Sequence, residues 1–181
     1  MAENEFISEK RKFQIEEAIL ILLLLLSVVG IGITDYSSHD GFTYWLFMVM
    51  IFGLFAILIA WLQSKKHDML DFTKILKEQF MHWTASLLVV GGAFLLQKSE
   101  QLNETNASLV ILLILSLAAI LDGIRIGWRF SFVGLFLGIS AIVMAYFDNF
   151  MWLEVFIAIA IVAITILWEI WITKRAKNEE Y

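Results

Sequence analysis

The chain contains no cysteine and no proline. Without cysteine it can form no disulfide, no thiolate nucleophile and no Cys-ligated zinc or iron–sulfur centre. Transporters often use proline or glycine to interrupt helices around a substrate, so the absence of proline favours unbroken helices. Basic residues are also few, with 13 Lys and Arg against 18 Asp and Glu, a net charge of -5. Nucleic-acid binding needs a clustered basic face, so we expect no nucleic-acid partner.

Apolar residues, in contrast, are abundant. Of 181 residues 60% are hydrophobic and the mean hydropathy is +0.80, more apolar surface than one soluble core of this length can bury. Six stretches approach the roughly 20 apolar residues that a helix needs to cross a bilayer. We therefore predict an all-α integral membrane bundle of about six transmembrane helices. The spans are 18–35, 41–64, 79–97, 105–126, 130–147 and 150–173, within a transmembrane domain of residues 15–175.

Charge and aromatic placement predict the orientation of these spans. Lys and Arg accumulate on the cytoplasmic side of short loops. If the N-terminus is inside, every one of the 13 Lys and Arg residues except Lys98 falls on the inner side. All 7 tryptophans fall near span ends, where an aromatic ring meets the interface. We predict cytoplasmic tails at 1–14 and 176–181, both termini inside, and a multi-pass location in a cell membrane, specifically the bacterial inner membrane.

The segment between the second and third spans, residues 66–80, sets apolar residues against charged ones at helical spacing. This pattern is typical of an amphipathic helix lying on the inner membrane surface. The alternative is a cytoplasmic extension of the third span, and the sequence leaves both open.

The inner end of the fourth span carries opposite charges at helical spacing. In one continuous helix Asp122, Arg125 and Arg129 share a face, so the carboxylate can pair with a guanidinium. One interpretation is a site for a lipid headgroup or phosphate, which arginine binds in bidentate fashion. The other is anchoring, in which the arginines reach lipid phosphates and Asp122 neutralises them. His82 lies about one turn into the third span. In the functional interpretation it joins a headgroup site or titrates near neutral pH, and in the alternative it is a hydrogen-bonded structural residue.

Glu154 is the acidic residue predicted to lie deepest, about one turn inside the sixth span. A carboxylate at that depth is costly unless it has a partner or a water-filled path, which suggests proton or cation conduction. The alternative is a carboxylate that reaches the outer headgroups. The spacing of His, Asp and Glu suits no metal site, and we expect no cofactor.

Small residues form patches on two spans. Gly134 and Gly138 make a GxxxG motif in the fifth span, and Gly91 and Gly92 are adjacent in the third. Such patches let helix backbones approach closely in lipid. They serve either packing within the bundle or association between chains.

Two functions fit these features, and the sequence contains no catalytic motif that we can identify. The first is a non-enzymatic membrane protein, a transport or channel-type subunit or a regulatory partner, whose contacts are membrane lipids and a second copy or another membrane protein. The alternative is a lipid-binding or lipid-active protein. Convergence of its four residues on a lipid-open cavity would favour the alternative, and a flat helical interface or a polar pore would favour the first. The four residues are His82, Asp122, Arg125 and Arg129.

Overall fold

The computed structural model describes residues 2–64, 69–147 and 151–179. Within these ranges it describes the side chains of residues 15–61, 73–147 and 152–171, apart from Glu154 and Glu169. The described residues form six α-helices and no strand, which confirms the all-α prediction. The helices are α1 (Ala2–Tyr36), α2 (Ser38–Ser64), α3 (Met69–Lys98), α4 (Glu104–Ile126), α5 (Trp128–Tyr146) and α6 (Met151–Glu179).

Five of the helices, α1 to α5, contain a segment long and apolar enough to cross a membrane. The prediction of a membrane-type helical bundle is thus confirmed for these five. In α6 the described apolar stretch is shorter, Val155–Trp168, so the sixth span stays a prediction. The five segments are Ile15–Tyr36, Ser38–Trp61, Thr73–Lys98, Glu104–Ile126 and Trp128–Tyr146.

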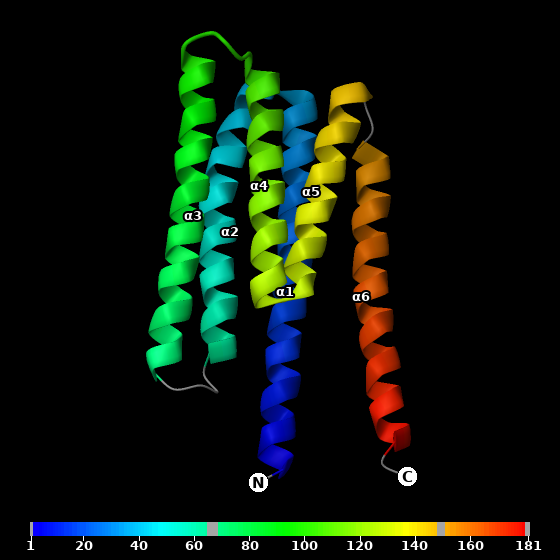
Figure 1. The fold of residues 1–181 in the computed structure, drawn as a ribbon. Coiled ribbons are helices and arrows are strands. Elements are labelled where there is room, and N and C mark those ends of the chain that lie inside the picture. Colours follow the sequence, from blue (N-terminus) through cyan, green and yellow to red (C-terminus); the bar gives the residue numbers. More distant parts are fainter. Residues whose placement is uncertain (1, 65–68, 148–150, 180–181) are drawn as a thin grey trace.

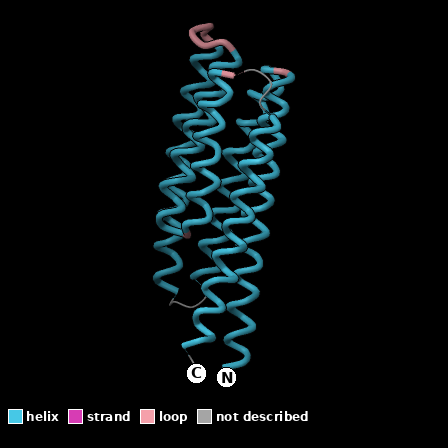
Figure 2. The backbone as a smooth tube through the Cα atoms, turned by 90° about the vertical axis from the view of Figure 1, so that its right-hand side faces the viewer, coloured by secondary structure: helices cyan, strands magenta, loops and turns pink. Residues whose placement is uncertain are grey.

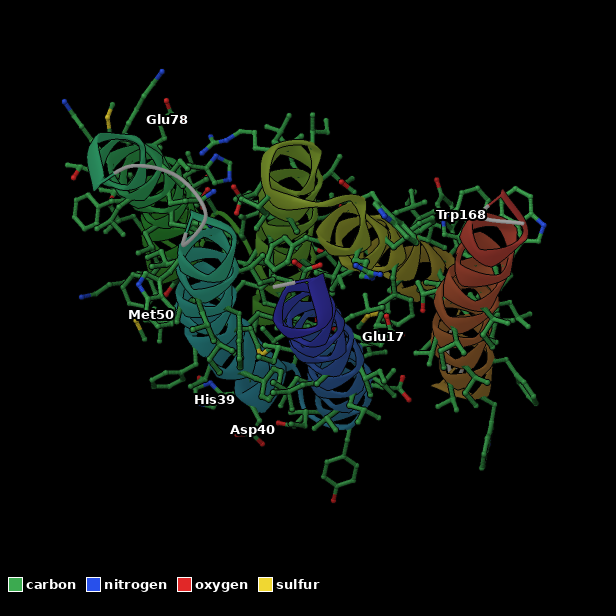
Figure 3. All side chains as sticks on the ribbon, turned by 90° about the horizontal axis from the view of Figure 1, so that it is seen from below. Glu17, His39, Asp40, Met50, Glu78 and Trp168 are labelled. Atoms are coloured by element: carbon green, nitrogen blue, oxygen red, sulfur yellow. The ribbon has the colours of Figure 1, made fainter. Side chains whose placement is uncertain are left out.

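The six helices run side by side along one axis, and both termini lie at the same end (Figures 1 and 2). We call this end the termini end. Helices α1, α2, α4 and α5 form the centre of the bundle. Helix α3 packs on α2 and α4, whereas α6 packs on α1 and α5. Figure 3, which looks along the axis, shows α3 and α6 at opposite edges of the bundle.

The apolar core lies between the central helices. Trp45 and Phe52 of α2, Leu115 of α4 and Phe136 of α5 are all fully buried. The outer faces are also apolar, with Leu88 on α3 among many large exposed side chains. An apolar exterior around an apolar core is expected where lipid replaces water as the solvent.

Helices α4 and α5 share the most extensive contact in the bundle. The Ser116 hydroxyl donates to the Gly134 carbonyl at 2.7 Å, and the Ser131 hydroxyl donates to the Ile120 carbonyl at 3.1 Å. A Cβ atom added to Gly134 would lie 2.7 Å from the Ile120 nitrogen, and one added to Gly138 would lie 2.7 Å from Ser116 Oγ. The GxxxG motif therefore lies in a contact within the bundle, where a larger side chain would push the helices apart.

The adjacent glycines of α3 have different surroundings. A Cβ atom added to Gly91 or Gly92 would meet nothing within 4 Å. Neither glycine lies against another helix among the described residues. Of the two roles that the sequence leaves open for them, packing inside the bundle is not observed, and association with another chain stays a prediction.

The segment at 66–80 is not a separate interfacial helix where the structure describes it. From Met69 onward it belongs to α3, the helix that also contains the third predicted span. Residues 66–68 lie outside the described part of the chain. The first glycine after Met69 is Gly91, and the chain has no proline, so no residue interrupts the hydrogen bonding of this helix. The continuous helix agrees with an extension of the third span, and the cytoplasmic location of that extension stays a prediction.

Candidate functional site

A fully buried carboxylate, Asp122, joins α4 to α3. It accepts a hydrogen bond from Gln79 Nε2 at Oδ1, at 2.6 Å, and one from Trp83 Nε1 at Oδ2, at 3.1 Å. Both donors lie on α3, four residues apart, so one face of that helix presents them together. Hydrogen bonds to a charged acceptor are stronger than those between neutral groups, and each contributes about 1.5–3 kcal/mol. The carboxylate therefore holds α3 against α4.

Two further polar side chains belong to this group, which we call the Asp122 cluster. Arg125 Nη2 lies 3.9 Å from Asp122 Oδ1, and the Arg125 side chain is 38% exposed. His82 Nε2 lies 3.0 Å from the Ala118 carbonyl oxygen and donates to it. The oxygen of the Gln79 amide is buried and has no hydrogen-bond partner among the described residues. The cluster thus comprises Gln79, His82, Trp83, Asp122 and Arg125.

Packing around Trp83 explains why the indole reaches the carboxylate. A Cβ on Gly53 of α2 would lie 3.2 Å from the Trp83 ring, so the absence of a side chain there makes room for the indole. Phe130 of α5 meets the ring edge to face, with ring centroids 6.3 Å apart. Trp83 is consequently 4% exposed. An indole buried in this way needs a partner for its N–H, and Asp122 supplies it.

A second charged group ties α1, α5 and α6 together; we call it the Arg129 cluster. Arg129 Nη1 on α5 donates to Glu16 Oε2 on α1 at 2.9 Å, and Arg129 Nε lies 3.3 Å from Glu17 Oε2. The hydroxyl oxygen of Thr165 on α6 lies 3.0 Å from Glu17 Oε1 and 2.8 Å from the Val162 carbonyl, and its single hydrogen serves one of them at a time. Glu17 lies on the side of α1 that faces α5 and α6 (Figure 3).

The electrostatics of the Arg129 cluster are those of a largely desolvated ion group. The side chains of Arg129, Glu16 and Glu17 are 15%, 21% and 13% exposed. Trp128 adds a cation–π contact, with Arg129 Cζ 5.3 Å from its ring centroid. A cavity of about 20 Å³, with room for about one water molecule, lies beside Glu16 and Arg129 and is otherwise lined mainly by apolar side chains. Removing Arg129 would leave two largely buried carboxylates without this cation in an apolar environment.

The four predicted lipid-site residues do not converge. His82, Asp122 and Arg125 meet in the Asp122 cluster, but Arg129 contacts α1 instead. The expected common face of residues 122, 125 and 129 does not form, because α4 ends at Ile126 and Gly127 has φ 143°. That conformation is one that residues with a side chain rarely adopt, so the helix cannot continue through it.

The remaining predicted site residue, Glu154, lies in α6, and its side chain is outside the described part of the structure. The prediction of a conducting carboxylate there therefore stays a prediction. Among the described residues, no group of three or more His, Asp or Glu side chains is placed to hold a metal ion.

Sequence reasoning missed five residues that make these contacts. Glu16 and Glu17 directly precede the first uncharged run, and their position alone does not distinguish them from solvated charges at the end of a span. The sequence does place these two carboxylates and Arg129 at the same predicted side of the membrane, the inner side. It does not show that α1 and α5 are neighbours. Polar side chains on one helix face were the corresponding signal in α3. The five residues are Glu16, Glu17, Gln79, Trp83 and Thr165.

At the end of the bundle away from the termini, polar contacts join the first turns of α2 and α4. His39 Nδ1 lies 2.8 Å from Glu104 Oε1, and the hydroxyl oxygens of Ser38 and Thr105 are also 2.8 Å apart. Asn103 caps α4 by accepting a hydrogen bond from the Asn106 N–H at 2.7 Å. These contacts are exposed to solvent and fix the register of the two helices.

The described residues thus contain two charged clusters that join helices, one toward each edge of the bundle, and a separate polar contact at the end away from the termini. Comparison of the chain with protein-family models, with curated proteins and with solved structures finds no match in any of the three.

Proposed function

We propose that this chain is a non-enzymatic membrane protein that works as an accessory or regulatory partner of another membrane protein, or of a second copy of itself. In this proposal all six helices span the bilayer, both termini lie in the cytoplasm and the membrane is a bacterial inner membrane. The contact is made by one face of α3.

The use of glycine in this bundle is the observation that carries the proposal. A Cβ added to Gly30, Gly41, Gly53 or Gly123 would lie within 3.2 Å of another side chain or backbone, as it would at Gly134 and Gly138. Gly91 and Gly92 differ from these six glycines, because a Cβ added to either of them would face open space. Glycine inside a helix costs about 0.5–1 kcal/mol relative to alanine. Two adjacent glycines that contact nothing in their own chain are explained if another helix approaches them.

The neighbouring side chains of α3 support the same interpretation. Leu88, Val89 and Leu95 are 73%, 58% and 64% exposed, whereas the buried described residues of this helix are Gln79, Trp83, Val90 and Ala93. Bulky apolar residues around a smooth centre offer a partner helix both ridges and a groove. Lipid contact alone explains the leucines but gives no reason for the glycines.

The placement of the charged residues favours a contact protein over a transport or channel subunit. Asp122, Glu16, Glu17 and Arg129 each interact with a neighbouring helix. A conducting path needs polar side chains that face a water-filled passage. The lipid-site alternative needs Arg129 beside His82 and Asp122, and Arg129 lies with α1 instead.

Photocrosslinking in native membranes tests the contact. A photoreactive amino acid at Gly92 is expected to give a discrete protein adduct, identified by mass spectrometry as this chain or one other membrane protein. The matched control is Ile142 on α5, also apolar and exposed at 58%, which should crosslink only to lipid. Lipid adducts alone at both positions would exclude the proposed contact surface.

Reporter fusions test the orientation separately. Fusions after Lys66, Arg129 and Lys177 should report the cytoplasm, and fusions after Asp40, Glu100 and Asn149 should report the outside, because of the charge bias. One reversed loop would refute the arrangement of six spans.

A further inference from the structure

The turn between α4 and α5 contains a single residue outside the helices. Gly127 separates Ile126, the last residue of α4, from Trp128, the first of α5. Its N–H donates to the Gly123 carbonyl at 2.9 Å, and its carbonyl accepts from the Phe130 N–H at 3.0 Å. With φ 143° and both backbone groups bonded, this turn has little freedom to absorb a displacement of either helix.

The two arginines that flank this turn belong to different clusters, which lie toward opposite edges of the bundle. Arg125, before Gly127, lies beside Asp122, which holds α3. Arg129, after Gly127, bonds to Glu16 and contacts Glu17, whose other oxygen lies within hydrogen-bond distance of Thr165 on α6. One rigid turn is therefore connected to both edge helices through one carboxylate on each side.

Each edge helix depends strongly on its carboxylate contact, because little else of it is buried. In α6 only Ala158 and Thr165 are buried among the described side chains. In the half of α3 toward the termini end, the buried described residues are Gln79 and Trp83, and both donate to Asp122. The polar contacts thus fix the positions of the two helices that the rest of the bundle contacts least.

The geometry points to a coupling device: the turn from Arg125 to Arg129 transmits displacement between α6 and α3, which lie at opposite edges. A shift of α6 at Thr165 moves Glu17 and Arg129, the turn follows, and the Asp122 contacts that position α3 change. The purpose of the coupling rests on the proposed function, since α3 carries the proposed contact face. The coupling itself does not depend on the proposed function, and it can be measured in a single isolated chain.

The alternative to coupling is that the Asp122 cluster and the Arg129 cluster are independent structural contacts. A spin-label experiment distinguishes coupling from independence. Labels at Met81 on α3 and Leu117 on α4, both exposed, report the position of α3 by their distance distribution in nanodiscs containing one chain each. The chain has no cysteine, so introduced cysteines label without background. Labels at Phe47 on α2 and Leu113 on α4 provide a reference distance that should not change.

Thr165→Val removes the hydroxyl at nearly constant volume and is expected to shift or broaden the Met81–Leu117 distribution. Thr165→Ser keeps the hydroxyl and should leave it as in the wild type. In an Arg129→Met background, Thr165→Val should add no further change, because the connection from Glu17 to the turn is already cut. An unchanged distribution in Thr165→Val would overturn the coupling, and so would an equal Thr165→Val shift with and without Arg129. Because each nanodisc holds one chain, failure here is distinguishable from failure of the Gly92 crosslink.

Discussion

Trp83 on α3 donates its indole N–H to the buried carboxylate of Asp122 on α4, at 3.1 Å. The same carboxylate accepts from Gln79 one turn earlier. A charged residue inside an apolar bundle is costly unless its hydrogen-bonding capacity is used, and here it is used by an edge helix. These polar contacts therefore position α3 in the bundle. The exposed apolar surface of α3 is not needed for that purpose.

Replacing Trp83 by Phe tests this contact. The variant keeps an aromatic ring but removes the N–H, so we expect the free energy of unfolding to fall by about 1–3 kcal/mol, the usual cost of leaving a buried acceptor short of a donor. Reversible unfolding in detergent or bicelles measures the change. Trp152→Phe is the control, since Trp152 is 74% exposed. Equal stabilities of the two variants would argue against the hydrogen bond.

Alanine substitution at Gly134 and at Gly91 should have opposite effects on the monomer. In Gly134→Ala the new methyl meets the Ile120 backbone at 2.7 Å, and overpacking of this kind costs about 1–3 kcal/mol. In Gly91→Ala the methyl meets nothing within 4 Å, and the gain in helix propensity should stabilise the monomer by about 0.5–1 kcal/mol. Unfolding of each variant at high dilution gives both values. A loss of monomer stability in Gly91→Ala would mean that α3 packs differently.

The predicted spans and the observed helices agree because both depend on local properties. Apolar runs of bilayer length mark α1 to α5, and the glycine at position 127 ends α4 close to the predicted boundary. The partners of Asp122 and Arg129 depend on which helices are neighbours, and an unaligned sequence contains no information about that. The charge pattern at 122, 125 and 129 is visible in the sequence, but these residues share one face only in an uninterrupted helix, and Gly127 interrupts it.

Arg129→Met should destabilise the bundle more than Arg125→Met. Arg129 is 15% exposed and compensates two carboxylates, so its loss should cost about 1.5–3 kcal/mol, the range for hydrogen bonds to charged groups. Arg125 is 38% exposed and 3.9 Å from Asp122, and a pair of that kind contributes about 0–1 kcal/mol. Unfolding midpoints of the two matched variants provide the measurement. Adding Glu16→Gln to Arg129→Met should recover part of the loss by removing an uncompensated charge.

A disulfide between Ser38→Cys and Thr105→Cys should form readily under mild oxidation. The two hydroxyl oxygens are 2.8 Å apart, so the substituted sulfurs need little movement to reach bonding geometry. Faster migration of the oxidised monomer on a denaturing gel, reversed by reductant, is the readout. Leu88→Cys with Phe156→Cys, on the opposite edge helices α3 and α6, is the control pair and should give no intramolecular bond. Failure of the first pair would place α2 and α4 in a different register.

Helix α1 is continuous from Ala2 to Tyr36. Its 35 residues extend about 50 Å at 1.5 Å each, whereas the hydrocarbon core is about 30 Å thick. If the apolar segment of α1 spans the bilayer as proposed, the helix extends beyond the hydrocarbon core, and Glu16 and Glu17 lie partway along it. A force on the first turns of α1 would reach these carboxylates through continuous helix, with no flexible segment in between. The Arg129 cluster would then be the fixed point about which α1 tilts.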